Sequence, residues 1–349
     1  MQPENKSILQ QEIFQQPVVV KELLEKEEKN IWTIAKSLEG KFQYIVIAAR
    51  GTSDNAGVYS QYLFGYFNHL QVGLATPSLY TYYQSPPNLK GALVIGISQS
   101  GQSPDINAVI EEAKRQGCPT LALVNDETSP LARTCDAMIP LHAQPEQAVA
   151  ATKSYTSALV GLAALSCAIS NDETRFQQVL ELPQILEETL SLGTEIQTRA
   201  ERYRYMQHCA VIGRGFSYTT AFEVALKIKE LSSVIAEPYS SADFRHGPIA
   251  TATPGFPVIL IAPKGIIQED ILALHTELRR RKVEEIIISN DAKLLDEAQT
   301  PLPIPNSVPE WLSPVASVIP GQLFAMNLAL VKGMNVDQPV GLTKVTSTR

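Results

Sequence analysis

The chain has 349 residues, of which 44% are hydrophobic and 19% are charged, which is enough apolar material for two domains rather than one. Its net charge of -7 disfavours a nucleic-acid partner, because a phosphate backbone demands a basic surface. The start of the chain lacks the layout of a signal peptide, and no run approaches the roughly 20 apolar residues of a membrane span. We therefore expect a cytoplasmic protein that makes no contact with a membrane.

The N-terminal half begins with helical patterns and continues with strand-like ones. Residues 1–40 form a polar segment of helical spacing, interrupted at Pro17. Continuous apolar runs follow at 44–49, 93–97 and 120–124, with weaker candidates at 71–75 and 137–140. Strands that alternate with helices predict a parallel sheet covered on both faces. This first domain spans 41–170, and a helix rich in small residues over 148–169 closes it.

The C-terminal half repeats this layout. After a charged helical connector over 171–205, apolar runs at 210–212, 258–262 and 285–288 lead into turns that contain glycine or asparagine. The similarity of the halves predicts a duplicated fold, with a second domain over 206–335 and a C-terminal tail over 336–349. The fold class is therefore two doubly wound α/β domains with parallel sheets.

Two hydroxyl-rich turns follow predicted strands of the first domain. Their polar side chains are Thr52, Ser53, Ser98, Gln99, Ser100 and Ser103. Ligands bind beyond the carboxyl ends of parallel strands, and a phosphate needs hydroxyl donors and the N–H groups of a helix N-terminus. The alternative is that these hydroxyls only cap the helices that follow. The corresponding turn of the second half, 262–265, has no hydroxyl, so we expect one phosphate site per chain.

A narrow charged stripe marks a predicted helix over 218–234. Glu223, Lys227 and Glu230 lie at i, i+4 and i+7, and hence on one face. They either form ordinary ion pairs worth about 0.2–0.5 kcal/mol each, or place a lysine beside a glutamate for proton transfer. Downstream, a polar stretch contains His246. Histidine exchanges protons near pH 7, although a lone histidine in a loop is more often structural.

The remaining titratable residues point to no metal and no cofactor. The other four histidines lack such a context, and there is no HExxH motif. The cysteines are scattered without paired spacing, beside small or apolar residues, as buried thiols are: Cys118, Cys135, Cys167 and Cys209. A basic run at 279–282 follows an amphipathic stretch and is predicted to be the solvated end of a helix.

Several segments occur in a fixed order along nearly the whole chain. They begin at Glu12-Ile13 and Gln16-Pro17 and continue with ARGTSDNAG, SQSGQSPD, ATKSYTS, ALKIKELS, FRHGP and DQPVGLTKVT. Together they resemble the SIS (sugar isomerase) family, in particular the isomerase half of glucosamine-6-phosphate synthase and its stand-alone relatives, which include glucosamine-6-phosphate deaminases. The resemblance implies two flavodoxin-like, three-layer domains, each around a five-stranded parallel sheet. It also implies that the two hydroxyl-rich turns hold a sugar phosphate and that Val149 and Thr152 line the sugar.

The resemblance further implies catalytic roles for four residues. Glu230 would carry a proton between C1 and C2 of the sugar, with Lys227 beside it. His246 would open the sugar ring, and Lys344 would meet the carbonyl carbon of the open-chain ketose. In the family this histidine serves the active site of a neighbouring subunit, so a homodimer is implied.

The function implied is the conversion of glucosamine 6-phosphate to fructose 6-phosphate and ammonia by aldose–ketose proton transfer. The same groups serve the amination direction in a glutamine- or ammonia-linked fructose-6-phosphate aminotransferase, a deglycase, or an isomerase of another sugar phosphate. The SPD and LTKVT segments resemble the stand-alone branch. Because Gln2 stands where synthases begin a glutaminase domain with cysteine, we expect this chain alone to draw no ammonia from glutamine. A non-catalytic sugar-phosphate sensor is the alternative from a different class.

Overall fold

The computed structural model describes residues 6–344, which divide into two compact units. The first unit comprises 18–146, 153–181 and 343–344, and the second comprises 6–17, 147–152 and 182–342. The outermost parts of the predicted N-terminal segment and C-terminal tail, 1–5 and 345–349, lie outside the described residues.

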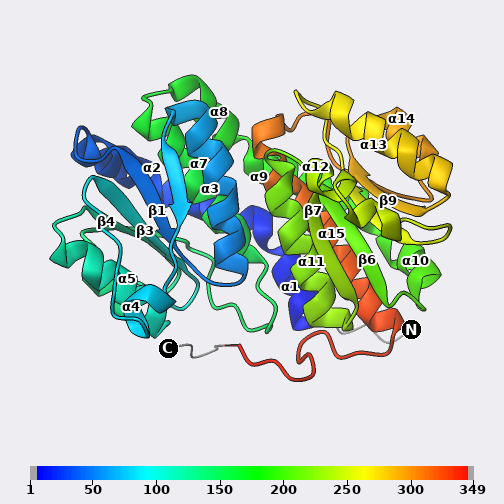
Figure 1. Ribbon diagram of the computed structural model, residues 1–349, viewed down its shortest axis with the longest axis horizontal. Coiled ribbons are helices and arrows are strands. Elements are labelled where there is room, and N and C mark those ends of the chain that lie inside the picture. The colour runs from blue at the N-terminus through cyan, green and yellow to red at the C-terminus, as the bar shows by residue number, and fades with distance from the viewer. Residues whose placement is uncertain (1–5, 345–349) are drawn as a thin grey trace. The chain divides into compact units, whose positions relative to one another are not determined.

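The first unit is built on a five-stranded parallel sheet in the order β2-β1-β3-β4-β5. Its strands are β1 (Tyr44–Ala48), β2 (Gln71–Leu74), β3 (Ala92–Ser98), β4 (Thr120–Val124) and β5 (Ala137–Pro140). Its helices are α2 (Gln16–Leu38), α3 (Thr52–Asn68), α4 (Ser78–Thr81), α5 (Pro104–Arg115), α6 (Pro130–Thr134), α7 (Lys153–Ile169) and α8 (Glu173–Leu180). Every residue of β3 and β4 is buried, because helices cover both faces of the sheet. One face packs on α5 and α6, while α3 and α7 pack together (Figure 1).

The second unit repeats this plan, with the strand order β10-β9-β8-β6-β7. Its strands are β6 (His208–Gly213), β7 (Ile235–Ser240), β8 (Pro257–Ile261), β9 (Glu284–Ser289) and β10 (Thr300–Pro303). Its α-helices are α1 (Ile8–Phe14), α9 (Leu182–Leu192), α10 (Ile196–Ala200), α11 (Ser217–Ser232), α12 (Ser241–Arg245), α13 (Gln268–Arg281), α14 (Ala292–Glu297) and α15 (Ser313–Val331). Its 3-10 helices are η1 (Gly193–Glu195), η2 (Glu201–Tyr203), η3 (Pro248–Thr251) and η4 (Glu310–Leu312). Helices α12, α13 and α14 pack on one apolar cluster, and α11 packs against α15 (Figure 1).

These two sheets confirm the predicted fold class of duplicated α/β units with parallel sheets. Read from opposite ends, the two strand orders are the same, so that β1 corresponds to β6 and the central strand β3 to the central strand β8. All five strands predicted in the first half are present. In the second half all three predicted strands are present, and they are three of the five strands of that sheet. The predicted basic helix end is also present, because Arg279, Arg280 and Arg281 form the last turn of α13.

Two strands of the second unit had no sequence prediction. Strand β7 contains Pro238, and β10 contains Pro301 and Pro303. Proline lacks a backbone N–H and is tolerated in a sheet mainly on edge strands, and β7 and β10 are the two edges of this sheet. These prolines interrupt the apolar pattern by which strands are predicted, and their place in edge strands explains why the sheet tolerates them.

The helix predicted over 148–169 begins later than its sequence pattern indicated. Helix α7 starts at Lys153, and 148–152 are not helical. The N–H groups of Gln147 and Ala148 instead donate to the Glu12 carboxylate of α1, at 2.6 and 3.2 Å. These contacts with the Glu12 side chain hold the segment in a non-helical conformation ahead of α7.

The expectation that no segment has the apolar length of a membrane span is wrong for one helix. Over 310–331, α15 and the turn before it reach that length, with a mean hydropathy of 1.5 in the most apolar window. However, 89% of that window is buried within the protein, where α15 packs against α11, α10 and α9. Its apolar character therefore matches its place in the core of the second unit.

Candidate active site

The two hydroxyl-rich turns lie at the carboxyl ends of neighbouring strands of the first sheet. Thr52 and Ser53 follow β1 and begin α3, whereas the turn 98–103 follows β3 and precedes α5. Strands β1 and β3 pair directly, which brings the two turns to one edge of the sheet. The structure thus collects the predicted phosphate-binding hydroxyls within the first unit.

The geometry disfavours the alternative that these side chains only cap helices. Ser103 stands at the N-cap position of α5, but its side chain makes no capping hydrogen bond. Gly51 is the N-cap residue of α3 and has no side chain to offer. Burial raises the pKa of the neighbouring Asp54 carboxyl, and the charge of Arg50 partly offsets this effect.

The β3 turn is held by hydrogen bonds between side chains and its own backbone. Gly101 has a φ of +63°, and an added Cβ would lie 2.1 Å from the Ser129 hydroxyl, so both conformation and space require glycine. Its N–H donates to the Ser98 hydroxyl at 2.9 Å, and Asn107 donates to the carbonyls of Gly101 and Ser103. A fixed loop presents its hydroxyls without reorganisation when a ligand binds.

Lys344 of the C-terminal tail lies in the same unit. Its Nζ is 3.0 Å from Oε2 of Glu146, whose side chain is fully buried. Glu146 also accepts hydrogen bonds from the backbone N–H and the hydroxyl of Ser154, at the start of α7. Sequence reasoning missed Glu146, because no local motif marks a partner 198 residues away. The carboxylate fixes the place of the lysine.

The predicted charged stripe is present on α11 of the second unit. Lys227 is 1% exposed; its Nζ lies 2.6 Å from Oε2 of Glu230 and 3.4 Å from Oε1 of Glu223. Glu223 is fully buried, whereas the Glu230 side chain is 24% exposed. A buried ammonium between two carboxylates is costly unless it is paired, so this is not a solvated surface ion pair. Glu230 is the member of the three that solvent reaches.

This stripe does not lie at the carboxyl edge of its own sheet. Helix α11 begins after the carboxyl end of β6 and ends before the amino end of β7, so Lys227 and Glu230 occupy its last two turns at the opposite edge. The rule that predicts ligand sites at the carboxyl ends of parallel strands therefore does not predict the position of Lys227 and Glu230.

His246 is exposed at the end of α12, followed by Gly247 with a φ of +135°. A charged network holds this short helix. Asp270 of α13 pairs with Arg214 and Arg245 at 3.0 and 2.9 Å, and it accepts a hydrogen bond from Ser241. Burial would raise the pKa of Asp270, but these partners outweigh it and lower the pKa. The histidine is therefore presented on a fixed support.

Val149 and Thr152 lie in the turn 147–152, which belongs to the second unit and which Glu12 of α1 holds. The tail contributes a further contact to α1, because the Asp337 carboxylate accepts the N–H groups of Ile8 and Leu9 at 3.1 and 2.8 Å. A carboxylate at a helix N-terminus is stabilised by the helix dipole. Glu12 belongs to the Glu12-Ile13 segment and Asp337 to the DQP segment. These two segments therefore hold the turn 147–152 and the start of α1 in place.

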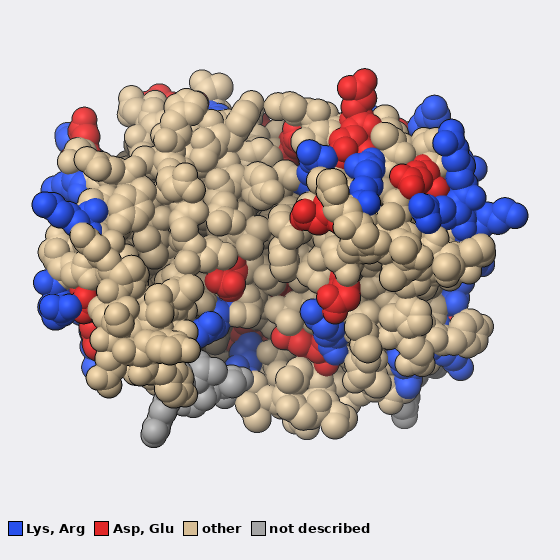
Figure 2. Space-filling model, viewed as in Figure 1, with Lys and Arg blue, Asp and Glu red and all other residues tan. Residues whose placement is uncertain are grey.

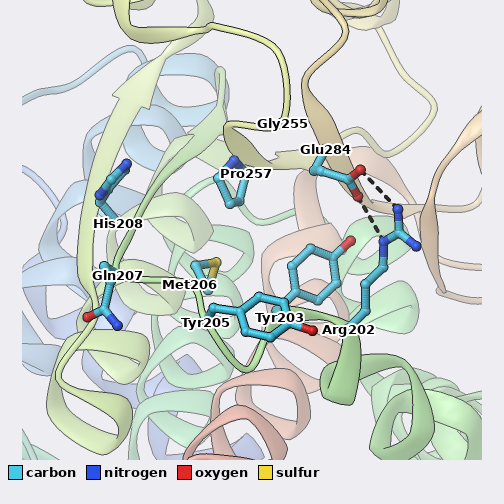
Figure 3. A pocket seen from close by; sticks show the side chains of 9 residues that line it. All are labelled: Arg202, Tyr203, Tyr205, Met206, Gln207, His208, Gly255, Pro257 and Glu284. Atoms are coloured by element: carbon cyan, nitrogen blue, oxygen red, sulfur yellow. Dashed lines mark hydrogen bonds and ion pairs between the residues drawn. The ribbon is translucent and has the colours of Figure 1, made fainter.

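A pocket of about 520 Å³ in the second unit is lined by other residues (Figure 3). It opens at the amino ends of β6, β8 and β9, at His208, Pro257 and Glu284. Arg202 and Glu284 point toward each other and form a two-pronged ion pair at 2.9 Å, which satisfies both charges within the protein. On the face shown in Figure 2, groups of Lys and Arg lie beside Asp and Glu in several places, with broad uncharged areas between them.

Comparison with known proteins identifies the family. The model of the SIS domain matches this chain twice, over 41–168 and 204–332, which covers both sheets. The chain belongs to the SIS domain family. Its two SIS domains carry the serine turns in the first copy and the Glu223–Lys227–Glu230 stripe in the second.

Similar proteins include glutamine–fructose-6-phosphate aminotransferases (isomerizing). That of Aquifex aeolicus is 35% identical over 345 residues, which are 98% of this chain and 58% of the relative. That of Pyrococcus horikoshii is 34% identical over 95% of this chain and 56% of the relative. The chain thus spans less than two thirds of the length of these curated relatives.

Solved structures share the fold. The C-terminal domain of glucosamine-fructose-6-phosphate aminotransferase from Francisella tularensis has a TM-score of 0.86 and 28% identity, covering 96% of this chain and 99% of that one. A glucosamine-6-phosphate deaminase from Thermotoga maritima has a TM-score of 0.77 at 21% identity, with 98% of this chain and all of that chain covered. At that identity, the likeness to the deaminase shows the fold alone.

Proposed function

We propose that this SIS protein is a sugar-phosphate isomerase that moves a proton between C1 and C2 of an amino-sugar phosphate. The observation that carries the proposal is the Lys227–Glu230 pair, a buried ammonium 2.6 Å from a partly exposed carboxylate. The ammonium orients the carboxylate and leaves its second oxygen for the substrate. The names of the relatives, which describe isomerizing enzymes of fructose 6-phosphate, support the same reaction class.

The substrate phosphate is assigned to the serine turns. The hydroxyls of Ser98, Ser100 and Ser103, with Thr52 and Ser53 from the adjoining turn, offer neutral donors at the start of α3 and α5. Gln99 adds an amide. Val149 and Thr152 remain proposals as contacts of the sugar.

For glucosamine 6-phosphate the proposed reaction runs in three steps. His246 assists opening of the ring to the aldehyde. Glu230 takes the proton from C2 while the aldehyde oxygen gains a proton, which gives an enolamine. Return of a proton to C1 and loss of one proton from the nitrogen then give a 2-imine with a hydroxyl on C1. Lys344 lies near the reacting carbon in this scheme. Addition of water to C2 of the imine then expels ammonia and leaves fructose 6-phosphate.

Solvent-proton exchange tests this reaction class without assuming its direction. Fructose 6-phosphate and glucosamine 6-phosphate are incubated with the protein in D₂O, and deuterium at C1 and C2 is followed by NMR. We expect exchange, and we expect Glu230→Gln to slow it by about 10²–10⁴-fold, the usual contribution of a general base. Glu237→Gln makes the same change at an exposed position of the second unit and should leave the rate unchanged. Exchange that survives intact in Glu230→Gln would remove Glu230 from the mechanism.

The amination direction is the second candidate, and the relatives favour it. Those proteins are named as aminotransferases and are longer than this chain. Ammonia or glutamine would then supply the nitrogen, and the proton would move from C1 to C2. The initial rates of the two directions distinguish this candidate. Amination is favoured if glucosamine 6-phosphate forms from fructose 6-phosphate and ammonium salts faster than it is broken down.

We also propose that the active form is a homodimer in which His246 serves the neighbouring subunit. The support is the exposure of His246 at the end of α12, together with its absence from the group of charges around Lys227.

A further inference from the structure

The turn after β8, residues 262–267, is the structural counterpart of the turn after β3. Each follows the central strand of a five-stranded parallel sheet and precedes a long helix, α5 or α13. Each contains a glycine, Gly101 or Gly265. The second unit therefore retains the framework that offers a phosphate site in the first.

An arginine–aspartate pair is repeated with this framework. In the first unit, Arg50 follows β1 and binds Asp105 in the first turn of α5 at 2.7 Å. In the second, Arg214 follows β6 and binds Asp270 in the first turn of α13 at 3.0 Å. The two units thus share the bracing of the site as well as its strands.

The two turns differ in what occupies them. In the β8 turn, the N–H of Ile266 donates to Oε2 of Glu310 at 2.7 Å. A Cβ added at Gly265 would lie 2.1 Å from the carboxylate carbon of Glu310 and 2.2 Å from its Oε2. Gly265 has no left-handed φ, so its missing side chain provides room for the carboxylate rather than a special backbone conformation.

The Glu310 carboxylate has the chemistry of the ligand that the first turn is proposed to take. It is an anionic oxygen acceptor against a backbone N–H, directly before the N-terminus of α13, where negative charge is stabilised. Lys264 is exposed in the same turn and adds a positive charge. A phosphate in this place would meet the same donors.

We propose that Glu310 is a built-in anion that fills the phosphate turn of the second unit and so restricts the chain to one phosphate ligand. The number of phosphates expected per chain rests on the proposed phosphate site of the first unit, whereas the role of Glu310 does not. Removal of the Glu310 carboxylate opens a second anion site at the Ile266 N–H and Lys264.

Titration with inorganic phosphate, followed by calorimetry and by ³¹P NMR, tests the proposal on the full chain. We expect one phosphate per chain in the wild type and two in Glu310→Ala. Glu277→Ala removes the same charge from α13, away from the turn, and should still bind one. Two phosphates in the wild type, or one in Glu310→Ala, would overturn the proposal. Glu310→Ser, which keeps a polar group, repeats the test if the alanine variant does not fold.

A second background separates this inference from the proposed function. In Ser98→Ala/Ser100→Ala, the first site should be lost, and adding Glu310→Ala should restore one site per chain. Loss of the wild-type site in the serine variant supports the phosphate assignment of the β3 turn. A gain from Glu310→Ala without such a loss would refute that assignment and leave the role of Glu310 standing. No gain in either background would refute the role of Glu310.

Discussion

At the scale of single residues, α11 holds a buried positive charge, that of Lys227. Lys227 is enclosed between Glu223 and Glu230 in a helix that is otherwise packed against α15. Such an arrangement stabilises little in itself, because removing Lys227 and Glu223 from water costs most of what the attraction between the charges returns. Its presence in the core is better explained by the need to hold the Glu230 carboxylate in one orientation.

Replacement of Lys227 by methionine should therefore lower the free energy of unfolding as well as the rate of the proposed reaction. Breaking a buried pair by removing one partner costs about 3–5 kcal/mol, since the Glu223 carboxylate stays buried beside an apolar side chain. The free energy of unfolding in denaturant measures this loss. Lys229→Met, at an exposed position two residues away, should change it by less than about 0.5 kcal/mol. A Lys227→Met protein as stable as wild type would show that Lys227 does not hold the charges of α11.

What the sequence predicts of the site depends on how far apart the partners lie. The spacing of Glu223, Lys227 and Glu230 placed them on one face of a helix, because helical geometry is local. Neither the depth of Lys227 nor the contacts of Glu146 and Glu310 follow from spacing. Those carboxylates bind groups 198 and 44 residues away in the chain.

At the scale of elements, a buried histidine joins α13 to β9 and α14. His275 is 4% exposed and lies 3.0 Å from both Glu285 of β9 and Glu297 of α14, while Arg279 of α13 also contacts Glu297. Burial lowers the pKa of His275, but hydrogen bonds to the two glutamates and their charges outweigh burial and raise it.

This cluster predicts a pH dependence of stability. A group whose pKa is raised in the folded state stabilises the fold fully below its unfolded value, near 6.5 for histidine, and the stabilisation is lost as pH rises through the folded value. The melting temperature should therefore fall from slightly acid to alkaline pH in the wild type. The fall should be smaller in His275→Asn, while His208→Asn, at an exposed position, should keep the wild-type profile. Identical profiles for all three proteins would show that the cluster does not act in this way.

Elements also show where sequence patterns reach their limit. Buried central strands such as β3, β4 and β8 are continuous apolar runs and were found from the sequence. The edge strands β7 and β10 pair on one side only, accept proline, and lack that signal. The start of α7 was misplaced because the Glu12 carboxylate, 135 residues away from Gln147, holds the segment before the helix. Glu146 then accepts the N–H of Ser154 in the first turn of α7.

At the scale of the whole molecule, one α/β plan is used twice with different side chains at the corresponding turns. Both SIS domains keep the strand order and the arginine–aspartate brace. Hydroxyl side chains fill the β3 turn, whereas the β8 turn has none and receives Glu310 instead. In the account proposed, the first copy binds the phosphate and the second copy moves the proton.

The proposed dimer makes a prediction of its own. Glu230→Gln and His246→Ala should each be poorly active, and a refolded equal mixture should recover activity. In a randomly reassorted homodimer with a shared site, one intact site forms in each mixed dimer, which gives about one quarter of the wild-type rate. Activity no greater than the average of the two separate variants would contradict the shared site.

The most direct test of the central claim is an assay of the purified protein with glucosamine 6-phosphate that follows ammonia and fructose 6-phosphate together. The account predicts that both appear in equal amounts and that both are lost in Glu230→Gln but not in Glu237→Gln. Neither product, together with no exchange of C1 or C2 protons in D₂O, would contradict it.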